Sequence, residues 1–150
     1  MEFSNQKRSK KIKQTFNLIG IIIVLIGLAF LWMKKDTLVL ITAGVFAVYV
    51  GISQFANLCY FYINTNNGKV LIRYYPIITL MKKEFDSIEF NHQLLVNFRI
   101  EKSMGFSDLD IAIRAKRGIA EYPTISLAAL KKEEIEQIRQ ALLEIMKNNN

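Results

Sequence analysis

The side chains in this sequence that could bind a metal or take part in catalysis are a single histidine, a single cysteine and one close pair of aspartates. His92 and Cys59 have no neighbouring histidine or cysteine in the sequence, so neither suggests a metal-ligand pair or a nucleophile–base pair. Asp108 and Asp110 share one face of a strand, but two carboxylates without further oxygen ligands make a poor cation site. The sequence therefore predicts no catalytic residue, no metal and no cofactor.

The chain also contains no Gly-rich phosphate-binding loop, no dinucleotide-binding motif and no nucleophile elbow. With one cysteine it can form no intrachain disulfide. We expect Cys59 to be a small buried apolar side chain and His92 to be a surface residue in a turn. The prediction is a protein that is not an enzyme; the alternative is an enzyme whose site is completed by another subunit.

The whole chain has a formal net charge of +7, and most of this positive excess lies near its start. Residues 1–36 contain seven Lys or Arg against two acids, whereas residues 59–150 contain thirteen against eleven. Nucleic-acid binders usually cluster their basic residues on the folded domain. We therefore expect no nucleic-acid partner.

Two long apolar runs without charge, residues 15–33 and 37–58, predict a transmembrane α-helical hairpin. Nineteen helical residues span about 28 Å, close to the thickness of a bilayer's hydrocarbon core. The first run ends in Trp32-Met33-Lys34-Lys35, not in the small residues of a signal-peptide cleavage site. Trp32 at one membrane interface and residues 60–62 (Tyr60, Phe61 and Tyr62) at the other fit an aromatic belt.

The distribution of Lys and Arg predicts that both termini are cytoplasmic. Only Lys34 and Lys35 lie in the loop between the spans. The opposite side has seven basic residues, five in a basic arm at residues 1–14 and two after the second span: Lys7, Arg8, Lys10, Lys11, Lys13, Lys69 and Arg73. The hairpin thus predicts a multi-pass protein of the cytoplasmic membrane.

Small residues recur on one face of each predicted span, where they allow helices to approach closely. Ala43, Ala47 and Gly51 are four residues apart in the second span, and Gly20 and Gly27 are seven apart in the first. These stripes pack either the two helices of one hairpin together or the hairpin against a second copy or a protein partner.

From residue 59 to 147 the pattern predicts an α+β domain of about seven short antiparallel strands and one helix. The strands are expected at residues 60–65, 69–75, 77–82, 85–90, 93–101, 108–115 and 119–127, with a tight turn at Asn66-Asn67-Gly68. In the strand at 93–101, the buried apolar face is expected to consist of residues 94, 96, 98 and 100, and the solvent-exposed (wet) face of residues 95, 97, 99 and 101. Residues 131–147 predict an amphipathic helix, with apolar side chains at 135, 138, 142 and 145 or 146, followed by a tail at 148–150.

About seven strands followed by one amphipathic helix resembles the order of a pleckstrin-homology (PH) domain. The whole chain resembles small bacterial membrane proteins in which two spans precede a PH-like domain. The resemblance is carried by the join at 58–63, the Asn67-Gly68 turn, Phe85-Asp86-Ser87-Ile88-Glu89-Phe90, and the stretch Ile125 to Lys132 that leads into an acidic helix start. It implies an antiparallel β-sandwich or barrel capped by the C-terminal helix, acting as an adaptor or regulator at the inner membrane.

Two functions follow as hypotheses. The first is a non-enzymatic interaction module whose partner is another protein. The second is direct binding of anionic lipid headgroups, to which basic side chains contribute about 1 kcal/mol per charge. The possible headgroup contacts are Lys7, Arg8, Lys10, Lys11, Lys13, Lys69, Arg73, Lys82 and Lys83. PH domains that bind phosphoinositides carry a basic signature around their first hairpin, of which only Lys69 and Arg73 are present here.

Overall fold

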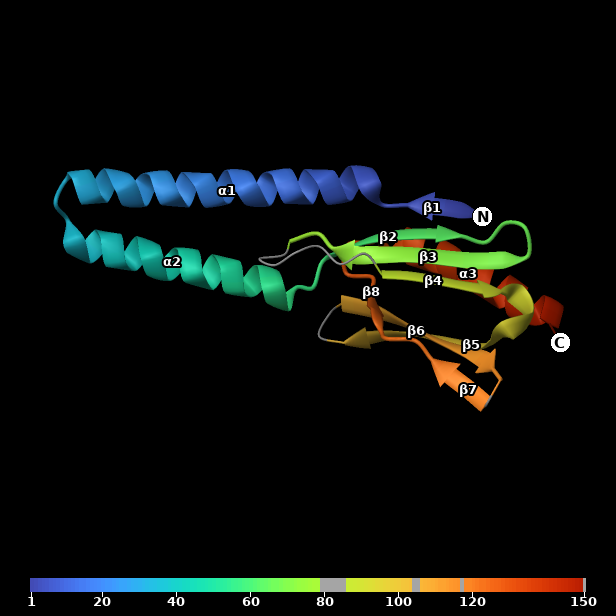
Figure 1. Cartoon of the computed structure of the whole chain (residues 1–150). Coiled ribbons are helices and arrows are strands. Elements are labelled where there is room, and N and C mark those ends of the chain that lie inside the picture. The colour runs from blue at the N-terminus through green and yellow to red at the C-terminus, as the bar shows by residue number, and fades with distance from the viewer. Residues whose placement is uncertain (79–85, 104–105, 117, 150) are drawn as a thin grey trace.

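The structure is a computed structural model of the chain that describes residues 1–78, 86–103, 106–116 and 118–149. A long helical hairpin projects from one end of a small domain (Figure 1). The hairpin consists of α1 (Gln6–Trp32) and α2 (Asp36–Phe55). Both helices are long and apolar enough to cross a bilayer, and the most apolar stretch of each has no residue buried inside the protein.

Helix α1 begins well before the predicted span at residue 15. The basic segment from Lys7 to Lys13 forms its first turns, because residues 6–19 contain neither proline nor glycine to interrupt a helix. The first residues of the basic arm are also ordered: they form the strand β1 (Glu2–Ser4). The arm is therefore part of the folded structure.

Among the described residues, the first sheet of the domain has four antiparallel strands in the order β1-β2-β3-β4. After β1, its members are β2 (Cys59–Asn64), β3 (Lys69–Pro76) and β4 (Asp86–Asn91). The predicted tight turn between β2 and β3 is confirmed, since Asn67 and Gly68 have φ angles of 59° and 72°. Positive φ at both central residues is what a two-residue hairpin turn requires.

The second sheet contains β5 (Leu95–Ser103), β6 (Phe106–Ala115) and β7 (Gly118–Glu121), with β8 (Ile125–Ser126) also paired to β6. The predicted strand at 119–127 is thus two strands, separated by a segment that includes Pro123, which cannot donate to a ladder. Of the predicted strand at 77–82, residues 77 and 78 form a bend and the remainder lies outside the described residues.

On β6, Leu109 and Ile111 are buried, but the alternation predicted for the strand at 93–101 is wrong at the start of β5. Leu95, expected on the wet face, is only 4% exposed. The short 3-10 helix η1 (His92–Leu94) precedes it, and the pairing of β5 with β6 shifts between Leu95 and Asn97. Such an irregularity changes which residues face the core, so the simple alternation does not hold there.

The C-terminal helix α3 (Lys132–Asn149) closes the domain, as its amphipathic pattern predicts. It contacts β5 and η1 and buries Ile138, Leu142 and Ile145. Side chains from both sheets and from α3 form one continuous core: Phe61, Ile63, Val70, Ile72, Ile88, Phe90, Leu95, Leu109, Ile111, Ile125, Leu127, Ile138, Leu142 and Ile145. Phe61 belongs to this core and is fully buried, so its predicted place at the membrane interface is wrong. The architecture is a helical hairpin followed by an α+β domain of antiparallel strands.

Candidate functional site at the junction of hairpin and domain

Both ends of the helical hairpin are built into the same sheet. β1 leads into α1, β2 follows α2, and the two strands pair antiparallel, with Phe3 opposite Ile63. Only Asn5 separates β1 from α1, and only residues 56–58 separate α2 from β2. The segment before α1 and the domain after α2 therefore lie at the same end of the hairpin, with short connections that restrict how the domain can turn.

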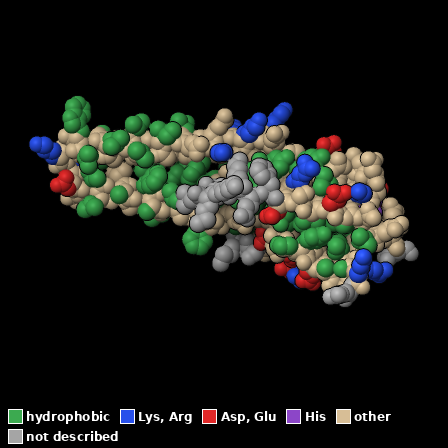
Figure 2. Space-filling view, in the orientation of Figure 1, with side chains coloured by type: hydrophobic (Ala, Val, Ile, Leu, Met, Phe, Trp, Pro, Cys, Tyr) green, Lys and Arg blue, Asp and Glu red, His purple; other side chains and the backbone are tan. Residues whose placement is uncertain are grey.

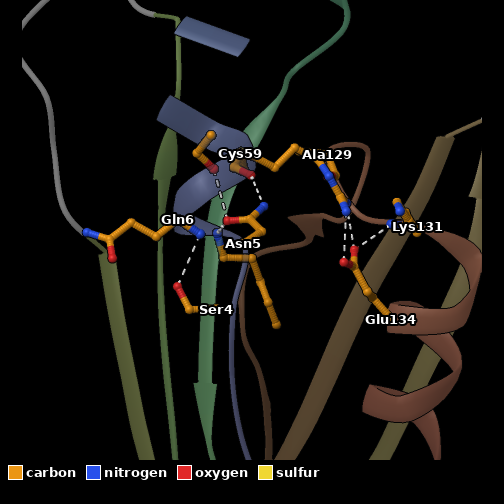
Figure 3. A network of polar contacts seen from close by, with 10 residues as sticks. Ser4, Asn5, Gln6, Cys59, Ala129, Lys131 and Glu134 are labelled. Atoms are coloured by element: carbon orange, nitrogen blue, oxygen red, sulfur yellow. Dashed lines mark hydrogen bonds and ion pairs between the residues drawn. The ribbon is translucent and has the colours of Figure 1, made fainter. Parts of the chain in front are cut away.

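Asn5 fixes the point where β1 becomes α1 (Figure 3). Its side chain is buried, and its Nδ2 donates to the carbonyl of Cys59 at 3.1 Å. Its Oδ1 accepts hydrogen bonds from the Phe61 amide at 2.9 Å and from the Ser9 hydroxyl at 3.0 Å. The Asn5 amide also donates to the Phe61 carbonyl at 3.2 Å. One carboxamide thus joins the helix start to β2 and leaves none of its own polar atoms unpaired, which a buried amide requires.

Arg8 joins the start of α1 to the start of α3. Its Nη1 and Nη2 donate to the two carboxylate oxygens of Glu134 at 2.6 and 2.9 Å, and Nη1 also donates to the Ala129 carbonyl at 3.1 Å. Glu134 in turn accepts a hydrogen bond of 2.7 Å from the Lys131 amide. This bond satisfies an otherwise unpaired donor at the start of α3. The two-pronged arginine–carboxylate pair fixes both position and angle.

The charge of Glu134 is stable at neutral pH. Partial burial raises its pKa, but the hydrogen bonds from Arg8 and from the Lys131 amide lower it by more. The resulting pKa lies below the ordinary value of 4.5. The pair with Arg8 is therefore fully ionised at neutral pH, when its attraction is greatest.

The predicted headgroup contacts fall into separate groups. Lys7, Lys10, Lys11 and Lys13 are exposed on the first turns of α1, whereas Arg8 is half-buried and paired. Figure 2 shows Lys and Arg side chains near this end of α1 and at the tip of the hairpin, with hydrophobic side chains over the helices between them.

Lys69 and Arg73, the remaining predicted contacts among the described residues, do not join the lysines of α1. Lys69 begins β3 at the end of the domain away from the hairpin (Figure 1) and pairs with Glu89 at 2.9 Å. Arg73 is exposed in the middle of β3. Lys82 and Lys83 lie outside the described residues.

The small residues of the two helices face different surroundings. A Cβ added at Gly27 would lie 3.4 Å from the Thr42 side chain, and one at Gly20 would lie 3.9 Å from Phe46 and Tyr49, so both glycines face α2. On α2, by contrast, Ala43 and Ala47 are exposed, and a Cβ at Gly51 would meet nothing within 4 Å. The stripe on α2 therefore lies outside the contact between α1 and α2.

An aromatic contact and a hydrogen bond also hold the two helices together near the domain. The Phe16 and Tyr49 rings stack with centroids 4.7 Å apart. The Tyr49 hydroxyl donates to the Phe16 carbonyl at 2.9 Å.

The side chains with possible chemistry are dispersed. Within the described ranges, no group of three or more His, Cys, Asp or Glu is placed to hold a metal ion. Burial, aided by the charges of Asp108 and Asp86, raises the pKa of the Cys59 thiol to about 11, so it is protonated and unreactive at neutral pH. Asp110 accepts a hydrogen bond from Thr124 at 2.6 Å and lies 3.6 Å from Arg99.

The junction residues Asn5, Ser9 and Glu134 are not found by motif or spacing. The helix dipole favours the three acids in the first turns of the C-terminal helix, but nothing in the sequence indicates that Glu134 pairs with Arg8, 126 residues away. Comparison of the chain with protein-family models, with curated proteins and with solved structures finds no match.

Proposed function

We propose that this chain is a membrane-anchored, non-enzymatic interaction module that holds a small domain in a fixed orientation at the bilayer for binding a partner protein. The observation that carries the proposal is the junction. Asn5 and Arg8 tie α1 to β2 and α3, and β1 pairs with β2 across the two ends of the hairpin. A domain held this closely acts as an oriented platform, because it lacks the long linker that would let it sample many positions.

The membrane in question is the inner membrane of a bacterium, with the domain on the cytoplasmic side. The support is the excess of Lys and Arg at the end of the hairpin that carries the domain. A reporter active only in the cytoplasm should function at the C-terminus and fail when inserted at Lys35. Activity at Lys35 and not at the C-terminus would reverse the orientation.

The domain is proposed to be PH-like. Within the described residues, support comes from two antiparallel sheets that share one core and from the C-terminal helix that closes it. Such small closed β domains serve as scaffolds on which edges and loops bind partners. An adaptor function needs no catalytic group, which is consistent with the buried, protonated thiol of Cys59.

The second candidate function is recognition of anionic lipid, and one observation favours it. The four lysines at residues 7, 10, 11 and 13 are exposed on the turns of α1 that precede the uncharged stretch. If α1 crosses the bilayer, these side chains lie at the level of the headgroups, where anionic lipids attract them.

Purification of the full chain in mild detergent separates the two functions. The adaptor function predicts a protein that co-purifies in a near-constant ratio after chemical crosslinking in native membranes. The lipid function predicts instead that the chain melts at a higher temperature in nanodiscs with anionic phospholipid than in zwitterionic ones, and that salt removes the difference. A salt-sensitive lipid effect without any co-purifying protein would overturn the adaptor function.

A further inference from the structure

A groove on the domain surface lies between the edge strand β1 and the helix α3. Its volume is about 940 Å³, and Phe3 and Ala141 contribute apolar surface to it. Phe3 packs against the core from β1, so the groove opens directly beside the sheet edge. Four of the residues lining it are glutamates: Glu2, Glu133, Glu136 and Glu144. Among the described residues that line it, Lys132 has the only basic side chain.

The strand beside the groove, β1, has an outer edge that pairs with no other strand among the described residues. In the antiparallel pairing of β1 with β2, the Asn5 amide donates to Phe61 and the Thr65 amide donates to the Met1 carbonyl. Backbone groups alternate in direction along a strand, so Glu2 and Ser4 direct theirs away from β2. In the part of the chain that the structure describes, no strand pairs along that outer edge of β1. An unpaired strand edge is a template for adding another strand.

We infer that this groove binds an extended, basic segment of a partner protein, which adds as a strand to the outer edge of β1 while its Lys or Arg side chains meet the glutamates of α3. The inference rests on the proposed function and specifies its binding surface. Charge complementarity selects the occupant, since a rim of four glutamates attracts a basic segment and repels an anionic lipid headgroup. The exposed lysines of α1 are helical, so the corresponding segment of a second copy does not present an extended strand.

The dimensions of the groove define the length of the segment. β1 has three residues, and residues 133–144 of α3 extend for about 16 Å at 1.5 Å per residue. An extended chain covers that distance with about five residues at 3.3 Å each. Because alternate side chains of a strand point to opposite faces, every second residue of the segment faces the groove. The segment therefore places basic or apolar residues at alternate positions.

The inference can be tested with a fluorescent peptide, Lys-Val-Lys-Val-Lys-Val-Lys, and the full chain in zwitterionic nanodiscs. Fluorescence anisotropy should show saturable binding. The triple variant Glu133→Gln, Glu136→Gln and Glu144→Gln should weaken binding by about tenfold or more, since charge pairs across an interface set much of its specificity. The matched control is a second triple variant with the same change in net charge on exposed residues outside the groove: Glu89→Gln, Glu101→Gln and Glu121→Gln. Equal weakening by the two triples would overturn the inference.

Two further measurements test the binding mode and the occupant. A peptide of the same sequence with N-methylated amides at alternate positions keeps its charge but loses strand hydrogen bonds, so it should bind about tenfold more weakly. Equal binding would exclude strand addition. A photoreactive residue at Ala141 should crosslink to the peptide; crosslinks to a second copy or to lipid, and none to the peptide, would overturn the inference.

Co-purification separates this inference from the proposed function. If a partner protein co-purifies equally well with both triple variants, the groove is not its binding site and the proposed function stands. If no partner protein co-purifies at all, the proposed function itself is refuted.

Discussion

Arg8 in α1 and Glu134 in α3 form a two-pronged ion pair, with nitrogen–oxygen distances of 2.6 and 2.9 Å, between a helix of the hairpin and the helix that closes the domain core. The two side chains are 30% and 21% exposed, so solvent screens the pair only partly. Glu134 also caps α3 through the Lys131 amide. The same carboxylate therefore stabilises the start of the closing helix and its attachment to α1.

Replacing Arg8 should destabilise the domain. Arg8→Ala leaves the Glu134 carboxylate and the Ala129 carbonyl without their shared donor. Such a loss typically lowers the free energy of unfolding by about 1–3 kcal/mol. The melting temperature of the full chain in detergent should fall by several degrees. Lys69→Ala, which removes an ion pair whose side chains are 58% and 54% exposed, should change the melting temperature little. Equal effects from the two variants would mean that the Arg8 pair does not hold the junction.

The Glu134 pair should make stability depend on pH in the acid range. Its pKa in the folded protein is below 4.5, so its contribution is fully present above about pH 4.5 and is lost as the pH falls through the lowered value. The difference in melting temperature between the wild type and Glu134→Gln should therefore be constant from pH 6 to 8 and shrink below about pH 4.5. A difference that grows on acidification would contradict the assigned direction.

The buried amide of Asn5 should protect the thiol of Cys59. At pH 8 the thiol reacts slowly, because with a pKa of about 11 roughly one molecule in a thousand carries the reactive thiolate. Asn5→Ala leaves the Phe61 amide and the Cys59 carbonyl without their partner, so β2 should open locally and maleimide labelling should accelerate about tenfold. Gln6→Ala, one residue along and exposed, is the control. Unchanged labelling of folded Asn5→Ala would show that the amide does not close this site.

The sequence predicts the elements of this protein better than it predicts their contacts. The uncharged runs, the Asn67-Gly68 turn and the spacing of Ile138 and Leu142 are local patterns whose physical consequences are local. The pairing of β1 with β2 is different, because a three-residue strand has too few positions to show alternation and its partner follows the whole hairpin. The burial of Leu95 likewise depends on a shift in the pairing of β5 with β6, which the periodicity of the sequence does not reveal.

Substitutions in the hairpin should distinguish its inner face from its outer face. Gly27→Leu places a large side chain where even a Cβ would lie 3.4 Å from Thr42. Such overpacking typically lowers the free energy of unfolding by about 1–3 kcal/mol. Ala47→Leu adds similar volume to an exposed position of α2 and should leave thermal stability unchanged. Light scattering in detergent completes the comparison: a smaller oligomer with Ala47→Leu would show that the stripe on α2 packs between chains.

Two adjacent leucines of α3 provide the sharpest comparison of burial with exposure. Leu142 is fully buried in the core, whereas Leu143 is 44% exposed. Leu142→Ala should destabilise the domain by about 2–5 kcal/mol, because it removes buried apolar surface and leaves a cavity. Leu143→Ala makes the same change in helix propensity, so any difference between the variants reports burial alone. Denaturant unfolding should be measured on the full chain, since a fragment that begins at residue 60 would lack β1, Asn5 and Arg8. Similar small effects from both substitutions would mean that α3 does not close the core.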